Sequence, residues 1–310
     1  MEIIAGVDEV GRGPLAGPVV AAAVILPDNH TIVGLRDSKK LSKIKREKLF
    51  PIIQDQALGI GIGEVDVKTI DKINIREATF KAMQIALGKL PIRPTKALID
   101  GHPLKSQIIP NEGIIGGDDL VDSIKAASII AKVTRDNMMD EYGNIFPEYG
   151  FEKHKGYGTE FHMNALKQYR STPIHRRSFN PVNKHMPTFN WLSEQKRIGW
   201  MGEKLAALYL KSKGLTILEM NRSCLPYGEI DIIAKNKNEL VFVEVKTAYK
   251  SNPDSLDEKV DNIKLTKMGH AIQHYQNQVE QIEDFRIDCI SVILQKNKPF
   301  FKHFEGILLD

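Results

Sequence analysis

Gly6–Pro18, which reads GVDEVGRGPLAGP, is the stretch around which the rest of this chain is organised. The apolar run that leads into it, Ile3–Val7, predicts a buried β-strand because it is short and partly β-branched. Asp8 and Glu9 then stand at the end of that strand, and the glycines that follow can adopt backbone angles that other residues avoid. The stretch therefore predicts a functional site at the C-terminal end of a strand.

The two carboxylates are followed closely by an arginine. Side chains of neighbouring strand residues point to opposite faces, so Asp8 and Glu9 converge on one ion only if the strand bends or ends between them, as Gly11 indicates. An acidic pair of this kind is in many proteins no more than a solvated strand end. Here the glycines on either side of Arg12 leave backbone N–H groups open to an anion. Carboxylates beside a phosphate contact favour a bridging divalent metal ion.

The overall composition predicts a cytoplasmic protein of two domains. With 310 residues, of which 42% are hydrophobic, the chain is long enough to bury two cores. The longest apolar run, Val19–Leu26, has eight residues, whereas a membrane-spanning helix needs about 20, and the N-terminus does not read as a signal peptide. Cys224 and Cys289 fit no metal-binding spacing, so we expect reduced, buried thiols.

Positive charge gathers in one tract of the first half. The formal net charge is +4, and Phe151–His185 holds seven Lys or Arg against two Glu. The tract also contains Tyr157, Phe161, Tyr169 and Phe179. Basic residues mixed with aromatic ones suit the backbone, sugars and bases of a nucleic acid, although many such tracts are only solvated surface.

Two more acidic points follow in an alternating pattern of strands and helices. Ala97–Gly101 repeats the opening pattern, a short apolar strand that finishes in Asp100 and a glycine. Asp118 and Asp119 follow two glycines and precede a predicted helix over 123–142. Carboxylates from three segments meet the needs of a two-metal phosphodiesterase, in which acids gather the ions and the ions activate water and stabilise the leaving oxygen.

The remaining elements place the chain in the α/β class. In the first half we expect strands over 19–26 and 59–65 and helices over 42–54, 67–72 and 75–90, with Ser42 as a helix cap. Residues 184–197 are expected to form a linker, because they include Pro187 and show little apolar periodicity. After it we expect a helix over 199–213 and strands over 216–220, 228–234 and 239–246.

The first half resembles the bacterial type 2 ribonucleases H, the ribonuclease HII family. The resemblance spans residues 1–183 and is carried by residues 8–26, DSKKL (37–41), LIDG (98–101), AASIIAKVTRD (126–136), HKGYGT (154–159) and HRRSF (175–179). It implies a ribonuclease H fold, a mixed sheet with helices, and a nuclease that uses Mn²⁺ or Mg²⁺. The implied substrates are RNA–DNA hybrids and duplex DNA with embedded ribonucleotides, which the family cuts to leave 5′-phosphates.

By motif, the resemblance assigns metal binding and catalysis to four carboxylates and ribonucleotide recognition to four further residues. The carboxylates are Asp8, Glu9, Asp100 and Asp118, and the recognition residues are Gly11, Arg12, Gly13 and Tyr157. Only a 2′-OH distinguishes RNA from DNA, and backbone without a Cβ can approach that hydroxyl closely. The tyrosine would stack on the next sugar; without the resemblance it reads as an ordinary loop tyrosine.

The fourth acid departs from the family pattern. The usual Lys-Gly-Asp reads Gly116-Gly117-Asp118 here, so Asp119 stays open as an alternative ligand. The eight residues from Asp118 to Ala126 match the family spacing and favour Asp118. Binding of hybrids without cleavage is disfavoured, because four acids would repel a duplex unless metal ions neutralise them.

Residues 198–310 predict a second, smaller α/β domain with acids of its own. Period 2 puts Glu244 and Lys246 on one face of their strand, and Asp231 lies on the strand before it. Restriction-endonuclease-like nucleases have an Asp on one strand and Glu-x-Lys on the adjoining strand. In these enzymes the carboxylates hold a metal ion and the lysine orients the attacking water. Alone, this pattern occurs by chance in many proteins.

The longer run resembles the YraN-like family of predicted endonucleases, which is similar to Holliday-junction resolvases. It is carried by residues 221–222, 228–231, 242–247 and 286–288. The matching site positions are Glu203, Asp231, Glu244 and Lys246, with Lys264 and Lys267 as phosphate contacts. Because a fold alone does not determine activity, the alternative is a non-catalytic module that binds nucleic acid or another protein.

Overall fold

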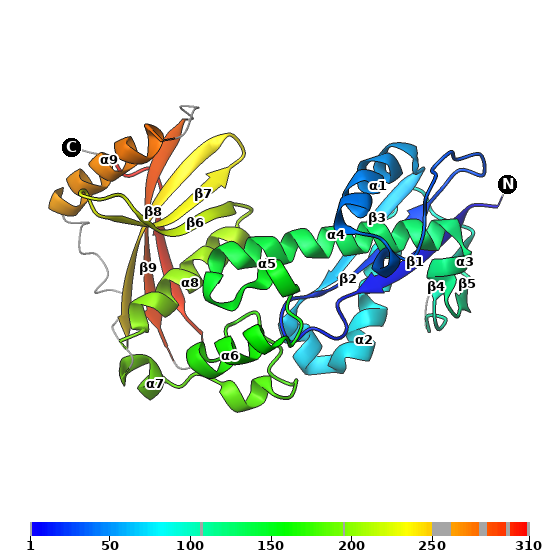
Figure 1. Cartoon of the computed structure of the whole chain (residues 1–310), viewed down its shortest axis with the longest axis horizontal. Coiled ribbons are helices and arrows are strands. Elements are labelled where there is room, and N and C mark those ends of the chain that lie inside the picture. Colours follow the sequence, from blue (N-terminus) through cyan, green and yellow to red (C-terminus); the bar gives the residue numbers. More distant parts are fainter. Residues whose placement is uncertain are drawn as a thin grey trace. The chain divides into compact units, whose positions relative to one another are not determined.

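The computed structural model describes residues 2–105, 108–194, 196–249, 262–278, 284–295 and 298–308 (Figure 1). The chain divides into two compact units, of which the first holds 1–140 and 149–186 and the second holds 141–148 and 187–310. The boundaries that the sequence indicates, 1–183 and 198–310, stay a prediction. The expected linker, 184–197, contains the short helix α7 (Phe189–Glu194), which packs against α8 (Ile198–Ser212).

The first unit is built on a mixed five-stranded sheet with the order β3-β2-β1-β4-β5. Its strands are β1 (Ile4–Val10), β2 (Val19–Ile25), β3 (Gly59–Val65), β4 (Lys96–Asp100) and β5 (Asn111–Ile114). The first three strands pair antiparallel, whereas β4 runs parallel to β1 and β5 runs parallel to β4. The N-terminal ends of β1 and β4 therefore lie at the same end of the sheet, and Asp8 and Asp100 lie toward the opposite end, where the two strands finish.

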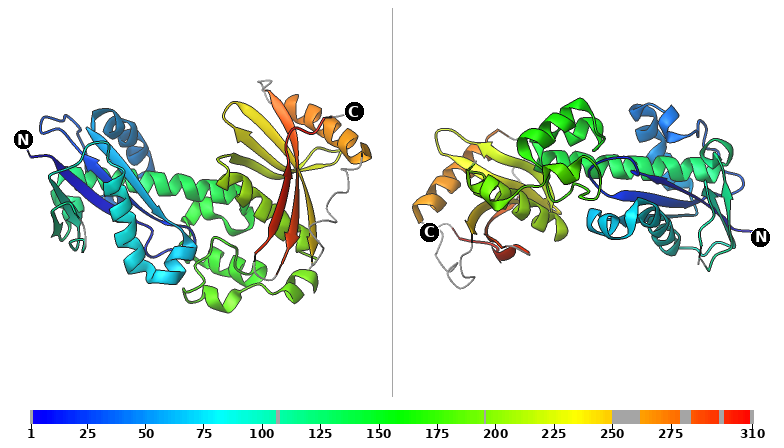
Figure 2. Two further views of the ribbon diagram at one scale, coloured as in Figure 1. Left: turned by 180° about the vertical axis from the view of Figure 1, so that it is seen from behind. Right: turned by 90° about the horizontal axis from the view of Figure 1, so that it is seen from below.

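Helices cover both faces of this sheet (Figures 1 and 2). The helical elements described in the first half are η1 (Ser38–Lys40), α1 (Lys43–Gln56), α2 (Val67–Gly88), α3 (Gly117–Leu120), α4 (Asp122–Ile145), η2 (Pro147–Tyr149), α5 (Phe151–His154), α6 (Glu160–Tyr169) and η3 (Val182–His185). Helix α2 packs on one face with Ala21 and Ala23 of β2, and α1 and α4 pack on the other with Ala22 and Val24. The strand is buried at every residue because its side chains alternate between two cores.

Helix α2 has a break at the position that the sequence indicates. The expected helices over 67–72 and 75–90 form one continuous element, but Asn74 has a φ of 68° and is not helical. Its side-chain oxygen accepts hydrogen bonds from the N–H groups of Arg76 (2.9 Å) and Glu77 (3.1 Å). Asn74 thus caps the second part of the helix. Ser42 caps α1 as expected, since its side chain accepts from the N–H of Lys45.

The second unit has its own mixed sheet, with the order β10-β9-β8-β7-β6. Its elements after α8 are β6 (Thr216–Ser223), β7 (Glu229–Asn236), β8 (Glu239–Tyr249), α9 (Asn262–Gln276), β9 (Phe285–Leu294) and β10 (Phe300–Phe304). Among these described strands, β8 and β9 pair parallel and the other neighbouring pairs are antiparallel. Helix α9 packs on one face through Met268 and Tyr275, and α8 lies against β8 and β9 (Figure 1).

The predicted fold class is confirmed, since each half is a mixed α/β sheet. Cys224 and Cys289 are buried, as the sequence predicts. In the part of the chain that the structure describes, none of the helices has both the length and the apolar character needed to cross a membrane.

The packing of α2 on β3 depends on two glycines and yields a stability prediction. A Cβ on Gly63 would lie 1.9 Å from the carbonyl oxygen of Ala82, and one on Gly61 would lie 2.0 Å from that of Ala86. Gly63→Ala is expected to lower the free energy of unfolding by about 1–3 kcal/mol, because the helix must move away from the sheet. Urea unfolding followed by circular dichroism measures this change.

Gly88→Ala is the matched control, because Gly88 ends the same helix and a Cβ there meets nothing within 4 Å. It is expected to leave stability unchanged or raise it by up to about 1 kcal/mol. Equal effects of the two substitutions would contradict the close approach of α2 to β3.

Candidate functional site

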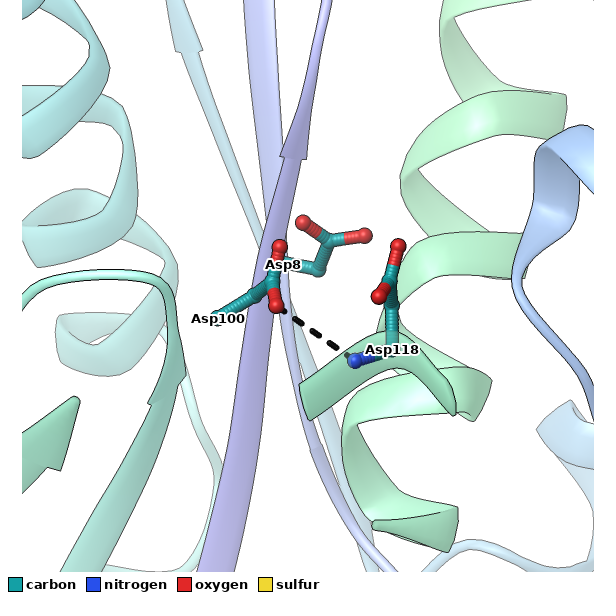
Figure 3. Close-up of side chains that lie close together, drawn as sticks. All are labelled: Asp8, Asp100 and Asp118. Atoms are coloured by element: carbon teal, nitrogen blue, oxygen red, sulfur yellow. Dashed lines mark hydrogen bonds between the residues drawn. The ribbon is translucent and has the colours of Figure 1, made fainter. Parts of the chain in front are cut away.

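Three aspartates from three elements meet at one end of the first sheet. Asp8 lies on β1, Asp100 ends β4 and Asp118 lies on α3, and one carboxylate oxygen of each lies within 4.8 Å of the others (Figure 3). Asp8 and Asp100 are neighbours because β1 and β4 pair parallel, with Val7 opposite Ile99. The N–H of Asp118 donates to Asp100 Oδ1 at 3.4 Å, which ties α3 to the end of β4.

Burial makes this cluster electrostatically unfavourable by itself. Asp8 is 4% exposed, and burial together with the charges of Glu9 and Asp100 raises its pKa well above the usual range. Burial, followed by the charge of Asp100, also raises the pKa of Asp118. Carboxylate oxygens are the ligand atoms that hard divalent cations such as Mg²⁺ and Mn²⁺ prefer. The three aspartates therefore have the chemistry of a divalent metal site.

Glu9 lies beside this cluster rather than in it. The expectation that the strand ends or bends between Asp8 and Glu9 is wrong, because β1 stays paired with β2 as far as Val10 and its side chains continue to alternate. The Glu9 carboxylate lies 3.6 Å from the guanidinium of Arg12. Together with Asp100, these two residues line a cleft of about 120 Å³. Asp100 thus borders both the aspartate cluster and the cleft.

The structure separates the two neighbouring aspartates of α3. Asp118 is buried and joins the cluster, whereas Asp119 forms an exposed ion pair with Lys40. The hydrogen bond from Lys40 lowers the pKa of Asp119. The family motif has a lysine two residues before Asp118, where this chain has Gly116. Lys40 of η1 supplies a positive charge nearby, but it pairs with Asp119.

Two fully buried arginines hold the glycine-rich turn in place. Arg176 donates to the carbonyl oxygens of Gly11, Arg12 (2.9 Å) and Gly17 (3.0 Å). Arg135 donates to those of three other residues, namely Ala16 (3.1 Å), Pro18 (2.9 Å) and Lys155 (3.0 Å). Gly11 has a φ of 97°, and a Cβ on it would lie 2.3 Å from Arg135 Nε. The turn is thus rigid, with its carbonyl groups directed inward.

Both arginines stay charged at neutral pH although they are 0% exposed. Burial lowers the pKa of Arg135 to about 10 and that of Arg176 to about 9. Sequence reasoning does not single them out, because a charged residue is expected at the surface. Their position inside the segments that carry the family resemblance, 126–136 and 175–179, is the signal that could have found them.

Tyr157 lies next to the glycine turn. It is 44% exposed, and its Cε1 atom is 3.5 Å from where a Cβ on Gly13 would be. The N–H of Leu15 donates to the carbonyl of Gly156 at 2.8 Å and joins the two loops. Arg12, Gly13 and Tyr157 therefore present exposed groups from adjoining loops.

Lys39 is a further cation at this site, which the sequence alone does not assign. It belongs to η1 and is exposed. Burial acts against its charged form, but the carboxylates of Asp37, Asp8 and Asp118 outweigh that effect and raise its pKa. The lysine therefore adds positive charge beside the acids, where a phosphate group would approach.

The acids predicted for the second unit are arranged differently. Pairing between β7 and β8 is described from Ile232 and Val243 onward, and beyond that point the Asp231 carboxylate accepts a hydrogen bond from the N–H of Val245 (2.7 Å). Glu203 accepts from the side-chain amide of Asn221 (2.8 Å), while Glu244 is 4% exposed on β8.

Within the described residues, the acids of the second unit form no three-carboxylate group like that of the first. Lys246 is half-buried on β8 and Lys267 is exposed on α9. The Lys264 side chain lies outside the described residues.

Comparisons with known proteins agree with this geometry. The sequence profile of the family named ribonuclease HII matches residues 5–182. This chain belongs to the ribonuclease HII family. Its first domain is thereby a hydrolytic endoribonuclease. Residues 202–292 match the uncharacterised protein family UPF0102, which confirms the YraN-like resemblance and leaves the activity of the second domain uncharacterised.

Individual relatives match the same half of the chain. Ribonuclease HII of Desulfitobacterium hafniense is 54% identical over 183 residues, which are 59% of this chain and 70% of that protein. Ribonuclease HII of Acetivibrio thermocellus is 56% identical over 178 residues, 57% of this chain and 70% of that protein. The crystal structure of ribonuclease H2 from Pyrococcus horikoshii is similar with a TM-score of 0.51 at 30% identity, and the match covers 59% of this chain and 96% of that one.

The raised pKa of Asp8 leads to a prediction about stability. The folded state of the metal-free ribonuclease binds the Asp8 proton more tightly than the unfolded state does, so ionisation of Asp8 costs stability as pH rises through the folded pKa. Asp8→Asn removes that charge and is expected to raise the melting temperature of the metal-free protein at pH 7, with a smaller gain near pH 4. A gain of about 1 kcal/mol would raise Tm by about 2–4 °C.

The same substitution is expected to reduce the rise in Tm that added Mn²⁺ produces in the wild-type protein, because the first metal site is lost. Differential scanning calorimetry with and without Mn²⁺ measures both effects. Asp119→Asn is the control, because Asp119 is exposed and outside the cluster, and it should keep the metal-induced rise. A full Mn²⁺ response in Asp8→Asn would refute the metal site.

Proposed function

We propose that residues 1–183 cleave the RNA of RNA–DNA hybrids and nick duplex DNA at embedded ribonucleotides, leaving 5′-phosphates. The observation that carries this proposal is the convergence of Asp8, Asp100 and Asp118 beside the turn that holds Arg12. Membership in the ribonuclease HII family supports the same substrates.

The position of each residue indicates the role that we assign to it in catalysis. Asp8, Asp100 and Asp118 would hold one divalent cation, and Glu9 and Asp100 would offer oxygens to a second on the cleft side. When bound, Mg²⁺ or Mn²⁺ supplies activation of the attacking water and stabilisation of the leaving oxygen. Lys39 adds a positive charge that attracts the phosphate backbone.

Recognition of the ribose depends on the rigid turn. Because Arg176 and Arg135 hold the backbone of residues 11–18 in one conformation, the turn meets the sugar without rearranging. A site built to bond a hydroxyl rejects the analogue that lacks it by a factor of about 10⁴–10⁵, since its polar groups are then left unpaired. Gly11, Arg12 and Gly13 would contact the 2′-OH, and the Tyr157 ring would stack on the neighbouring sugar.

The two aspartates of α3 provide the test. Asp118→Asn is expected to lower the rate of nicking of a duplex with one ribonucleotide by more than about a thousandfold, because several kcal/mol of transition-state stabilisation is lost. Asp119→Asn, its neighbour outside the cluster, should keep the wild-type rate. Cleavage of an end-labelled duplex in Mn²⁺ or Mg²⁺ measures both. Wild-type rates in Asp118→Asn would overturn the assignment, and loss of activity only in Asp119→Asn would transfer the role to that residue.

We further propose that residues 198–310 form a DNA endonuclease with Asp231, Glu244 and Lys246 at its centre and Glu203 nearby. The observation in its favour is the strand arrangement: β7 and β8 adjoin, and Asp231 lies where the described pairing ends, at the level of Glu244. Lys246 follows Glu244 at the spacing that keeps two side chains on one face. Lys267 of α9, which is exposed, would contact a phosphate.

The full-length Asp8→Asn variant isolates this second activity, because the first site is disabled. With Mn²⁺ it is expected to cut branched, nicked or single-stranded DNA, and addition of Glu244→Gln should remove that cleavage. The matched control is Glu239→Gln, on the same strand but at the far end. If Asp8→Asn cuts none of these substrates yet retains them in a gel-shift assay, the second domain is the non-catalytic binding module instead.

A further inference from the structure

Three histidines lie directly behind the loop that carries Tyr157, and the proposed chemistry uses none of them. His162 of α6 is 0% exposed and His175 is 1% exposed, while His154, which ends α5, is half-buried. His162 and His175 pack against the rings of Tyr149 and Phe151 at centroid distances of 5.2–6.4 Å. Buried imidazoles in an aromatic cluster need defined hydrogen-bond partners.

The hydrogen bonds of two of these histidines have only one consistent direction. The N–H of Thr172 donates to His175 Nδ1 at 3.0 Å, so the proton of His175 is on Nε2. His175 Nε2 lies 3.0 Å from His162 Nε2 and therefore donates to it. The proton of His162 must then be on Nδ1, which donates to the carbonyl oxygen of Tyr157 at 2.9 Å. The chain runs from Thr172 through two neutral rings to the Tyr157 peptide.

Both rings are neutral for a physical reason. A second proton on His162 would place two N–H groups against each other at the contact between the two Nε2 atoms, and a second proton on His175 would point at the N–H of Thr172. Burial lowers the pKa of His162 to about 4 and that of His175 well below the usual range. The direction of the chain is therefore maintained throughout the neutral pH range.

The same loop is also held from its other side. The N–H of Gly156 donates to His154 Nδ1 at 3.3 Å, and His154 Nε2 donates to the carbonyl of Tyr149 at 2.7 Å. The His154 ring stacks on His162 with centroids 4.7 Å apart. The Gly156 carbonyl accepts from Leu15, and the N–H of Thr159 donates to the Tyr157 carbonyl at 2.9 Å, so hydrogen bonds restrain the loop on either side of Tyr157.

We propose that His162 and His175 are positioning residues for the substrate and that they act through Tyr157. This inference rests on the proposed function, in which the tyrosine ring contacts the sugar next to the ribonucleotide. A half-exposed ring gains affinity from stacking only if its backbone is already placed, and a misplacement of about 1 Å can cost about a hundredfold in rate. His162, oriented by His175, donates to the Tyr157 carbonyl, which also accepts from the N–H of Thr159. These bonds set the position of the ring beside Gly13.

Matched amide substitutions separate the hydrogen bond from mere packing. The amide of asparagine can take the place of histidine Nδ1, and the longer glutamine reaches the place of Nε2. His162→Asn therefore keeps the donor to Tyr157, whereas His162→Gln loses it. At position 175 the order is reversed, because His175→Gln keeps the donor to His162 and His175→Asn loses it. We expect kcat/KM for the single-ribonucleotide duplex to fall about tenfold or more in His162→Gln and His175→Asn only.

A double-mutant cycle with Tyr157→Ala decides whether the effect passes through the tyrosine. In that background His162→Gln is expected to have no further effect on kcat/KM. The same loss in both backgrounds, or the same loss in the asparagine and glutamine variants, would overturn the inference and leave a purely structural role. The melting temperature of each variant is measured in parallel, and the pair at position 175 serves if a variant at 162 does not fold.

The cycle also distinguishes this inference from the proposed function. If Tyr157→Ala keeps the wild-type kcat/KM, both the substrate contact proposed for Tyr157 and the positioning role fail, while the cleavage activity stands. If Tyr157→Ala is impaired while His162→Gln is equally harmful with and without the tyrosine, the proposed function stands and only the positioning role fails.

Discussion

Repulsion between buried carboxylates is the constraint on which the rest of the first domain depends. Two unit charges 4.8 Å apart repel by about 3–4 kcal/mol at an effective dielectric constant near 20. The fold overcomes this cost through two apolar cores, one on each face of the sheet, which share the fully buried strand β2. Strand pairing and the contact of α3 with the end of β4 hold the acids together, and a divalent cation between them would relieve their repulsion.

In both the glycine turn and the loop of Tyr157, buried polar side chains form hydrogen bonds with the backbone and fix its position. Arg135 and Arg176 direct their guanidinium groups to backbone carbonyls, and charge-assisted hydrogen bonds offset part of the cost of burying them. His154 and His162 do the equivalent work for the loop of Tyr157 with neutral rings. Residues that are exposed at the site, such as Arg12 and Tyr157, are therefore presented by backbone that buried polar side chains hold in place.

The two domains use similar residue types in different ways. In the first, a parallel pair of strands and the helix α3 bring three aspartates together. In the second, Asp231 and Glu244 come from neighbouring strands, and Asp231 accepts a backbone N–H of β8. Family membership follows the same division, since ribonuclease HII describes residues 5–182 and an uncharacterised family describes residues 202–292.

Local sequence patterns were sufficient to place many elements. Short apolar runs followed by an aspartate predict β1 and β4, each with a carboxylate toward its C-terminal end. Apolar residues at helical spacing over 123–142 predict α4. These predictions succeed because burial on a sheet or on one face of a helix imposes a period on the sequence. By contrast, β5 is not predicted, because NEGI at residues 111–114 has little apolar character and becomes a strand only by pairing with β4.

The sequence by itself indicated the residues from which a site could be built, namely the acids and the glycine turn, and the family to which they belong. The tertiary structure alone decided that Glu9 lies apart from the aspartate cluster, because pairing with β2 extends β1 to Val10. It also decided that Asp118 is in the cluster and Asp119 outside it. Arg135, Arg176 and His162 acquire their roles only when carbonyl groups from other segments surround them, and the hydrophobic pattern of the sequence does not predict that environment.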